Sequence, residues 1–333
     1  MASIQRLVIP HMQKVKIVQL DPIFRQKTSI VYPPFKKGRY LEEYFYEYVT
    51  THTFSYVPSA VYIPAFWTNI MINPTFSRHA VILQHLLDQA LKVYPSETHF
   101  FTVCQHDDGP IFRLPKNTVI FGACTGDIPI PLIYEDTENR LISRAKDSAD
   151  TVPANLASFV GTITHPVRSE MAKYLVGRDG VDTTIQTSWT NIVSDNNAKR
   201  FIESSLASRF VISPRGYGRS SFRYFEALLL DRIPVYIWDD IEWLPYKEML
   251  DYSKFAVSVH VSNINTLYDR LSSIKSEEYV AMREEAKRHA HWFTLEGMSR
   301  YILSKAYNED VSQPPHPFSI VSESSVQPVG PAQ

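Results

Sequence analysis

The stretch that decides the fold is Arg209–Asp240, RFVISPRGYGRSSFRYFEALLLDRIPVYIWDD. Its apolar pattern predicts a strand over Arg209–Ser213, a helix over Arg219–Leu230 and a second strand over Ile233–Ile237. A turn with two glycines separates the first strand from the helix. Because strand, helix and strand follow one another, we expect the two strands to lie parallel in one sheet, with the helix packed against it.

The same alternation extends along the chain in both directions. Further strands are expected over Val15–Leu20, Ala60–Pro64, His99–Cys104, Thr118–Phe121, Leu156–Val160 and Phe255–His260. Further helices are expected over Tyr40–Val49, over Arg78–Val93, from about Val167, over Ile264–Ile274 and over Ser276–Ala290. Repeated alternation of this kind is typical of an α/β protein with parallel sheets that helices cover on both faces.

Length and a change in composition predict two domains. A chain of 333 residues exceeds the size of one common domain. A polar segment with three prolines, residues 129–154, is typical of an interdomain crossover. We therefore expect two Rossmann-like domains, residues 1–150 and 151–308. Residues 309–333 are rich in Pro and Ser and have too few apolar side chains to pack, so we expect a mobile tail.

Composition argues against several classes of protein. The formal net charge is −1 and the Lys and Arg residues are scattered, whereas nucleic-acid-binding domains carry a basic patch. Two cysteines, Cys104 and Cys124, are too few for a disulfide scaffold and favour a reducing compartment, although one bridge between them is compatible with the sequence. The sequence shows no signal peptide and no apolar run near the ~20 residues that span a bilayer, so we expect a cytoplasmic protein.

The turn that follows the first strand of the quoted stretch has the composition of an anion site. Gly216 and Gly218 leave backbone N–H groups accessible, and the next helix directs the positive end of its dipole to the same place. Ser220 and Ser221 are placed to cap that helix and to donate hydroxyls to the anion. Phosphate oxygens are the expected guest, although two glycines also fit a purely structural turn.

Three charged residues flank this turn. Arg215 lies in the turn and Arg223 lies one helical turn later, and either guanidinium suits a charge-assisted bond to a diphosphate. Glu226 projects from the same side of the helix as Arg223 and is placed to accept hydrogen bonds from both hydroxyls of a ribose. The alternative is an Arg223–Glu226 pair on a solvated face. The convergence of all these residues on one turn favours a nucleotide-diphosphate site.

The quoted stretch resembles the signature of the exostosin-like glycosyltransferases (glycosyltransferase family 47). That signature is a strand ending in Pro-Arg-Gly, a Ser-containing turn, an Arg-x-x-Glu-Ala-Leu helix and a strand beginning Ile-Pro-Val. The matching residues here are Pro214–Gly216, Ser220–Ser221, Arg223–Leu228 and Ile233–Val235, with Asp239–Asp240 where the family often has an acidic pair. Upstream, similar segments are Val61–Pro64, His99–Phe101, His106–Gly109, Gly126–Pro129 and Leu156–Gly161 followed by Arg168.

The resemblance implies a GT-B fold, in which two Rossmann-like domains face each other across a cleft. It also implies an inverting mechanism, a UDP-sugar as co-substrate without a separate cofactor, and a glycan or glycoprotein acceptor. The acceptor would bind residues 1–150 and the donor residues 151–308. The chain departs from the family in lacking the N-terminal anchor of the Golgi members. Ile212 and Ser213 also stand where cysteines often precede Pro-Arg-Gly. Both departures fit a cytoplasmic enzyme, such as one with which a large virus glycosylates its coat proteins.

No metal site is expected from the sequence. Metal-dependent nucleotide-sugar enzymes hold a divalent ion with Asp-x-Asp, which this chain lacks, and its histidines show no pairing at ligand spacing. The leaving diphosphate would then be stabilised by Arg168, Arg215 and Arg223 together with the helix start at Ser220.

An inverting reaction also needs a general base near the acceptor hydroxyl. Asp107, with His106 beside it, follows an expected strand, where the ligand crevice of an open α/β sheet lies. Asp127 is the alternative base, and all three residues also fit simple turn caps. Tyr217 and Gly161 are candidates for contacts with the nucleotide base or the sugar.

Two other functional classes stay open at this point. An NAD-dependent sugar-modifying Rossmann enzyme would need G-x-G-x-x-G at an early turn, whereas here Ser221 takes the third glycine's place and the turn lies in the second half. A non-catalytic glycan-binding module would bind sugar without turning it over. Hydrolysis of a nucleotide-sugar donor distinguishes such a module from an enzyme.

Overall fold

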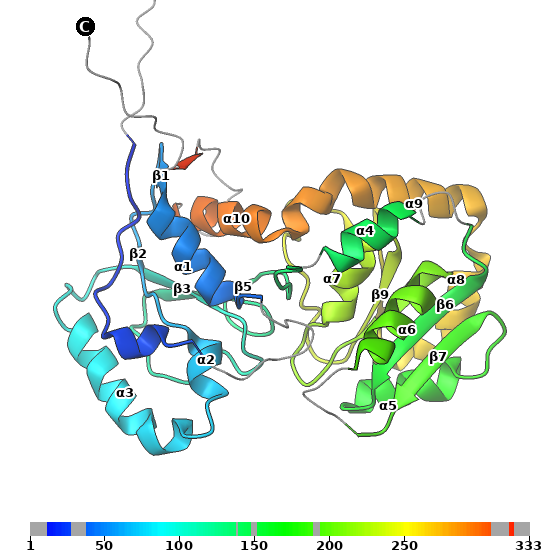
Figure 1. The fold of residues 1–333 in the computed structure, drawn as a ribbon, viewed down its shortest axis with the longest axis horizontal. Coiled ribbons are helices and arrows are strands. Elements are labelled where there is room, and N and C mark those ends of the chain that lie inside the picture. Colours follow the sequence, from blue (N-terminus) through cyan, green and yellow to red (C-terminus); the bar gives the residue numbers. More distant parts are fainter. Residues whose placement is uncertain are drawn as a thin grey trace, which may run out of the picture.

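Two parallel sheets with surrounding helices make up most of the computed structural model, which describes residues 12–27, 38–137, 139–147, 152–188, 194–307 and 320–322 (Figure 1). The first sheet has the strand order β2-β3-β4-β5 and all its pairs are parallel. Its strands are β2 (Val61–Tyr62), β3 (Phe100–Cys104), β4 (Thr118–Gly122) and β5 (Ile128–Pro129). The helices of this half are α1 (Leu41–Thr51), α2 (Trp67–Met71) and α3 (Phe76–Leu91).

The second sheet has the strand order β10-β9-β8-β6-β7 and is also entirely parallel. Its strands are β6 (Asn155–Thr162), β7 (Val181–Gln186), β8 (Ser208–Pro214), β9 (Ile233–Trp238) and β10 (Val257–His260). Its helices are α5 (Pro166–Leu175), α6 (Asp195–Leu206), α7 (Phe222–Leu229), α8 (Leu267–Ser273) and α9 (Ser276–His289), and α4 (Arg140–Asp147) precedes it. β8 and β9 are buried almost throughout, as continuous apolar runs require.

The two halves share one hydrophobic cluster. It includes Phe121 of β4, Tyr236 of β9 and Tyr301 of α10. Helix α10 (Leu295–Tyr307) follows the second sheet along the chain but packs against α1 of the first half (Figure 1). Because an extensive apolar contact limits relative movement of two units, side chains from both halves can hold defined places in one site.

The expected α/β class with parallel sheets is confirmed, as are most of the elements within one to three residues of their bounds. The expected strand over Val15–Leu20 is wrong. That segment makes only an isolated bridge from Ile17 to Tyr62, without a ladder. The elements that were not expected include β7, α6 and α10, as well as the shorter α2, β5, α4, β1 (His52–Phe54) and β11 (Ile320–Ser322). β7 is a half-buried edge strand, so its sequence lacks the apolar run of a central strand.

Of the expected tail, residues 309–333, the structure describes only Ile320–Ser322, as strand β11 paired with β1 (His52–Phe54). The other tail residues lie outside the described residues, and the domain limits near 150 and 308 stay predictions. Cys104 and Cys124 are both buried and free. Within the described ranges, no helix combines the length and the apolar character needed to cross a membrane.

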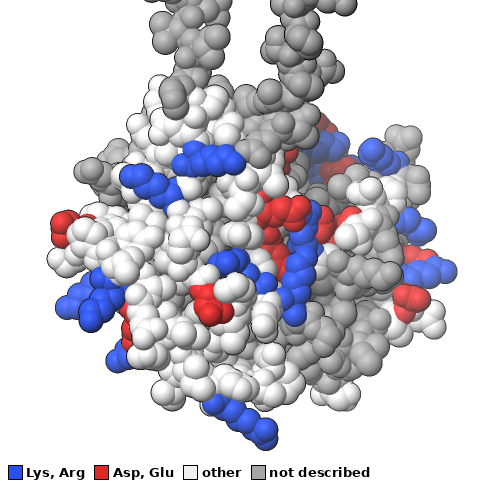
Figure 2. All heavy atoms as spheres, turned by 60° about the vertical axis from the view of Figure 1, so that its left-hand side comes forward, with Lys and Arg blue, Asp and Glu red and all other residues white. Residues whose placement is uncertain are grey.

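Charged side chains are mixed on the surface. On the face displayed in Figure 2, Lys and Arg are interspersed with Asp and Glu and do not gather into one basic patch. This distribution agrees with the scattered charges of the sequence and with the low net charge.

Candidate functional site

A cavity of about 480 Å³ lies at the carboxyl ends of β6 and β8. The second half of the chain supplies most of it, through the end of β6, Arg168 of α5, the turn after β8, α6 and α7. We call these residues the second-half wall. The first half supplies Asp107, Leu132, Tyr134 and Leu141, which we call the first-half wall. A crevice beyond the carboxyl ends of parallel strands is the usual ligand site of α/β sheets.

The glycine turn lies on the cavity wall and is packed closely, more so at Gly218 than at Gly216. A β-carbon on Gly216 would lie 3.2 Å from Nη2 of Arg168. A β-carbon on Gly218 would lie 2.2 Å from Oδ1 of Asp107 and 2.8 Å from Sγ of Cys124. Neither glycine is required by a positive φ. Gly218 is needed because the first-half wall touches the turn there.

The start of α7 faces the cavity. Ser220 and Ser221 are buried and line it, as does Arg223 in the first helical turn. The helix begins at Phe222 and its N-cap is Ser221, whose hydroxyl makes no capping hydrogen bond, so the expected capping role is wrong in this structure. The first turn contains no acidic residue to oppose the positive end of the helix dipole. This end of α7 is therefore suited to an anion.

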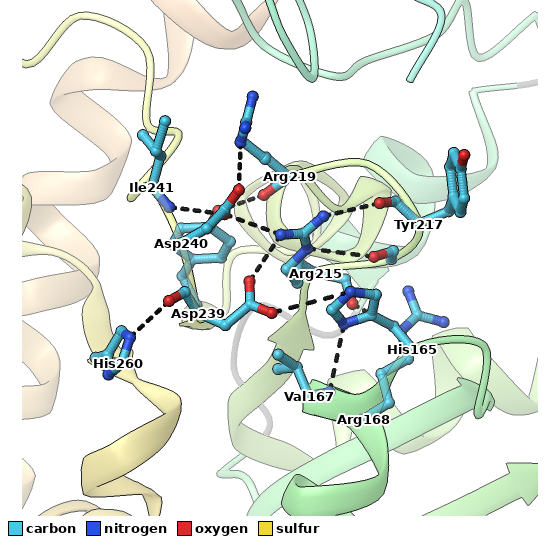
Figure 3. Close-up of polar contacts among 12 residues, drawn as sticks. His165, Val167, Arg168, Arg215, Tyr217, Arg219, Asp239, Asp240, Ile241 and His260 are labelled. Atoms are coloured by element: carbon cyan, nitrogen blue, oxygen red, sulfur yellow. Dashed lines mark hydrogen bonds and ion pairs between the residues drawn. The ribbon is translucent and has the colours of Figure 1, made fainter. Parts of the chain in front are cut away.

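Arg215 braces the turn and is not among the residues that line the cavity. Its Nη1 donates to Asp239 at 2.7 Å and to Asp240 at 2.9 Å, and its Nη2 donates to the carbonyl oxygen of Tyr217 at 2.8 Å (Figure 3). The two carboxylates follow β9, the neighbour of β8, so parallel pairing brings them to the arginine. In this structure the guanidinium is occupied by this network rather than directed at the cavity.

Asp240 also receives a hydrogen bond from Arg219 at 2.7 Å. Burial acts to raise the pKa of Asp240, but the hydrogen bonds from Arg219 and the Ile241 N–H and the charge of Arg215 outweigh it and lower the pKa. Asp240 therefore stays ionised at neutral pH and keeps both arginines in place.

Arg168 brings its positive charge to the cavity wall. Its Nε donates to the carbonyl oxygen of Arg215 at 3.0 Å and its Nη1 to that of Thr162 at 2.8 Å. Its helix, α5, begins after His165, whose side chain caps it by accepting from the N–H of Val167. Burial, followed by the charge of Arg215, lowers the pKa of His165, so the imidazole is neutral.

Arg223 and Glu226 pair with each other, as the alternative interpretation held, but not on a solvated face. Glu226 is 3% exposed and lines the cavity. Its Oε1 accepts from the hydroxyl of Tyr134 at 2.7 Å. Arg223 also donates to the carbonyl oxygen of Val160 at 3.2 Å and stacks on Phe201, with 3.9 Å from its guanidinium carbon to the ring centroid. Arg223 therefore fixes the orientation of Glu226.

The three expected acid–base residues occupy different places. Asp107 lines both the large cavity and an adjacent one of about 70 Å³, and burial raises the pKa of its carboxyl group. His106 lines only the smaller cavity, where its Nδ1 accepts from the N–H of Asp108 at 3.2 Å. Asp127 lines neither, and its Oδ2 accepts from the N–H of Ile120 at 2.8 Å, the geometry of a turn cap.

The remaining candidates and several unexpected residues complete the wall. Gly161 lines the cavity, and Tyr217 lines it with 66% of its surface exposed, which leaves the ring free to stack on a ligand. Sequence reasoning missed Tyr134 and the residues of α6, among them Asn197 and Phe201. The N-cap Ser194, which accepts from the N–H of Asn197, was the available signal for α6.

The described residues include no group of three or more His, Cys, Asp or Glu side chains placed to hold a metal ion. Cationic groups at the cavity include the side chains of Arg168 and Arg223, together with the positive end of α7.

Comparisons with known proteins agree on one activity class. Residues 116–274 match the model of the Exostosin GT47 domain family. One relative, described as a probable glycosyltransferase of Arabidopsis thaliana, is 28% identical over 213 residues, which are 59% of this chain and 42% of that protein. A second such protein of the same plant is 35% identical over 88 residues, 26% of this chain and 18% of its own length. The matched region thus spans less than half of either relative.

Among solved structures, the crystal structure of TarM aligns with 66% of this chain and 57% of its own, at 12% identity and a TM-score of 0.33, a similarity too low to define the fold. The family match runs from β4 to α8 and contains the whole second-half wall. Residues 116–274 are therefore similar to the Exostosin GT47 domain, and the two relatives that match parts of this chain are both described as probable glycosyltransferases.

Proposed function

We propose that this chain is an inverting glycosyltransferase. It transfers a sugar from a nucleotide-diphosphate donor, a UDP-sugar, to a hydroxyl group of a glycan or glycoprotein, without a metal ion or another cofactor. The arrangement that we propose is of GT-B type, with residues 1–150 binding the acceptor and residues 151–308 the donor. The observation that carries the proposal is the large cavity, where an anion site and a buried carboxylate on the second-half wall face Asp107 on the other wall.

The second-half wall suits the nucleotide-diphosphate. The positive end of α7, with the hydroxyls of Ser220 and Ser221, and the guanidinium of Arg168 offer donors to the diphosphate oxygens. Glu226, held by Arg223, offers a carboxylate to the ribose hydroxyls. These positive groups are fixed before the reaction, so they stabilise the charge that develops on the leaving diphosphate. Arg215 contributes by holding the turn in shape.

Asp107 is the general base of the proposed reaction. Its carboxylate takes the proton of the acceptor hydroxyl while the acceptor oxygen forms a bond to the anomeric carbon of the donor sugar. The bond from that carbon to the diphosphate oxygen breaks on the opposite face, and UDP leaves with the electron pair. Two observations support Asp107 over Asp127. Asp107 lies on the walls of two adjoining cavities, as a group between donor and acceptor must, and burial raises its pKa toward neutrality.

Thermal-shift measurements with UDP, GDP and their sugars test the donor assignment, because a ligand that binds only the folded protein raises its Tm. We expect the largest shift with UDP compounds and none with NAD. Release of UDP from a UDP-sugar without acceptor would separate an enzyme from a glycan-binding module. Turnover is expected to survive EDTA. A complete loss in EDTA that manganese restores would overturn the metal-independent mechanism.

A further inference from the structure

Cys124 lies where the two cavity walls meet. It follows β4, its side chain is buried, and its thiol is free. The position of a β-carbon on Gly218 is within 2.8 Å of Sγ of Cys124 and 2.2 Å of Oδ1 of Asp107. The glycine turn, the thiol and the candidate base therefore pack together at one point, although Cys124 lines neither cavity.

Groups on two sides of the thiol interact with it. The interaction of the Cys124 thiol with Asp107 lowers the pKa of that carboxyl group, and the backbone N–H of Ser220 acts to lower the pKa of the thiol. Burial raises the pKa of Cys124 well above its ordinary value, so the sulfur keeps its proton and remains a donor. The thiol thus lies between the backbone just ahead of α7 and the carboxylate of Asp107.

We propose that Cys124 is a positioning residue of the transfer reaction. Its thiol holds the Asp107 carboxylate at a constant distance from the turn that binds the diphosphate, and it does so without touching either substrate. The inference rests on the proposed function, in which Asp107 is the general base. It adds a residue outside both cavities to the machinery of that site.

Several groups act on Asp107 besides the thiol. Burial has the largest effect and raises the pKa of its carboxyl group, and the neighbouring charge of Asp108 acts in the same direction. The hydrogen bond from Cys124 and the charges of His106 and Arg215 lower the pKa. Removing the thiol donor therefore raises the pKa of Asp107. A base with a higher pKa is lost at a higher pH, so the acid limb of the activity profile moves upward.

The test compares Cys124→Ala, which removes the donor, with Cys124→Ser, which keeps one. In Cys124→Ala we expect the acid limb of kcat/KM to rise by about half to one pH unit, the size of one hydrogen bond's effect. We also expect kcat to fall several-fold while the KM for the donor stays unchanged. Cys124→Ser restores most of the wild-type profile. Cys104→Ala, which removes the other buried free thiol, is the matched control and leaves the acid limb in place.

Two further measurements separate positioning from mere packing. In an Asp107→Asn background, Cys124→Ala is expected to have no additional effect on residual turnover, and a further loss of turnover would mean that the thiol acts only through packing. Infrared titration of the Asp107 carboxyl group, assigned by difference from Asp107→Asn, needs no substrate. An Asp107 pKa that is the same in folded Cys124→Ala as in the wild type overturns the inference, even if no donor is turned over. Absence of UDP release by the wild type, in contrast, would count against the proposed function.

Discussion

The two walls of the cavity are built on different principles. On the second-half wall, each charged side chain is held by several partners. Arg168 is held by two carbonyl oxygens, Arg223 by Val160, Phe201 and Glu226, and Glu226 by Arg223 and by Tyr134 of the first-half wall. On the first-half wall, as the described residues form it, a single carboxylate, Asp107, reaches the cavity, and it packs against the thiol of Cys124 and the backbone at Gly218. The second-half wall is therefore a rigid template, whereas the first-half wall presents one carboxylate that its neighbours position.

The family match covers both walls except for Asp107. Residues 116–274 include every second-half wall residue and also Leu132, Tyr134 and Leu141 of the first-half wall, but they begin after Asp107. A rigid template suits recognition of a donor, and a single carboxylate suits proton transfer to or from a substrate. The comparison therefore predicts that changes in the second-half wall act mainly on donor binding, and changes at Asp107 mainly on turnover.

The largest effect is expected for Asp107→Asn. An amide cannot take the acceptor proton, so kcat should fall by about 10²- to 10⁴-fold, the usual contribution of a general base. The Kd for UDP, measured by calorimetry, should stay within a factor of about two of the wild-type value because the second-half wall is unchanged. Asp127→Asn, which alters a carboxylate in a turn away from both cavities, is the control and should retain its turnover. Unchanged turnover in Asp107→Asn would remove Asp107 as the base.

The second-half wall could be predicted from the sequence more fully than the first-half wall. The strand, glycine turn, helix and strand of Arg209–Asp240 were predictable because each depends on local periodicity and turn chemistry. The sequence did not reveal that Arg215 holds the turn in shape. Its contact with Asp239 could have been predicted, because the two residues follow successive parallel strands and so meet at one sheet edge. Asp107 and Asp127 both follow strands, and only tertiary packing shows that one of them reaches the cavity.

The second-largest effect is expected for Arg168→Met, which removes a positive charge from the second-half wall but keeps an unbranched side chain. Loss of a charge-assisted hydrogen bond to the diphosphate should weaken UDP binding by roughly tenfold to a hundredfold. The effect on kcat should be smaller than that on affinity. The control is Arg178→Met, which changes an exposed arginine just beyond the end of α5. The guanidinium of Arg178 packs on the ring of Tyr268, and the variant should bind UDP normally. Equal affinities in the two variants would break the proposed division between the walls.

A third prediction addresses the point where the walls touch. Gly218→Ala places a methyl group against Asp107 and Cys124, so we expect a loss of about 1–3 kcal/mol in the free energy of unfolding. Displacement of the carboxylate should lower kcat by about tenfold, because small misplacements of a reacting group are costly. Gly216→Ala is the matched control in the same turn. Its methyl group meets only the end of the Arg168 side chain, at 3.2 Å rather than 2.2 Å, so denaturant unfolding should show a smaller loss.

The smallest effect is expected for Tyr217→Ala. Tyr217 lines the cavity, but most of its ring is exposed, so its removal should leave the Tm unchanged within measurement error. If the ring stacks on the donor, the variant should bind UDP about two- to tenfold more weakly, the usual size of an aromatic contact. Tyr217→Phe should bind like the wild type because stacking needs the ring and not the hydroxyl. Comparison of UDP with UDP-sugar locates the contact, because loss of affinity for both indicates stacking on the nucleotide base. A loss of affinity confined to the UDP-sugar indicates contact with the sugar. Unchanged affinity for both ligands would mean that Tyr217 does not contact the donor.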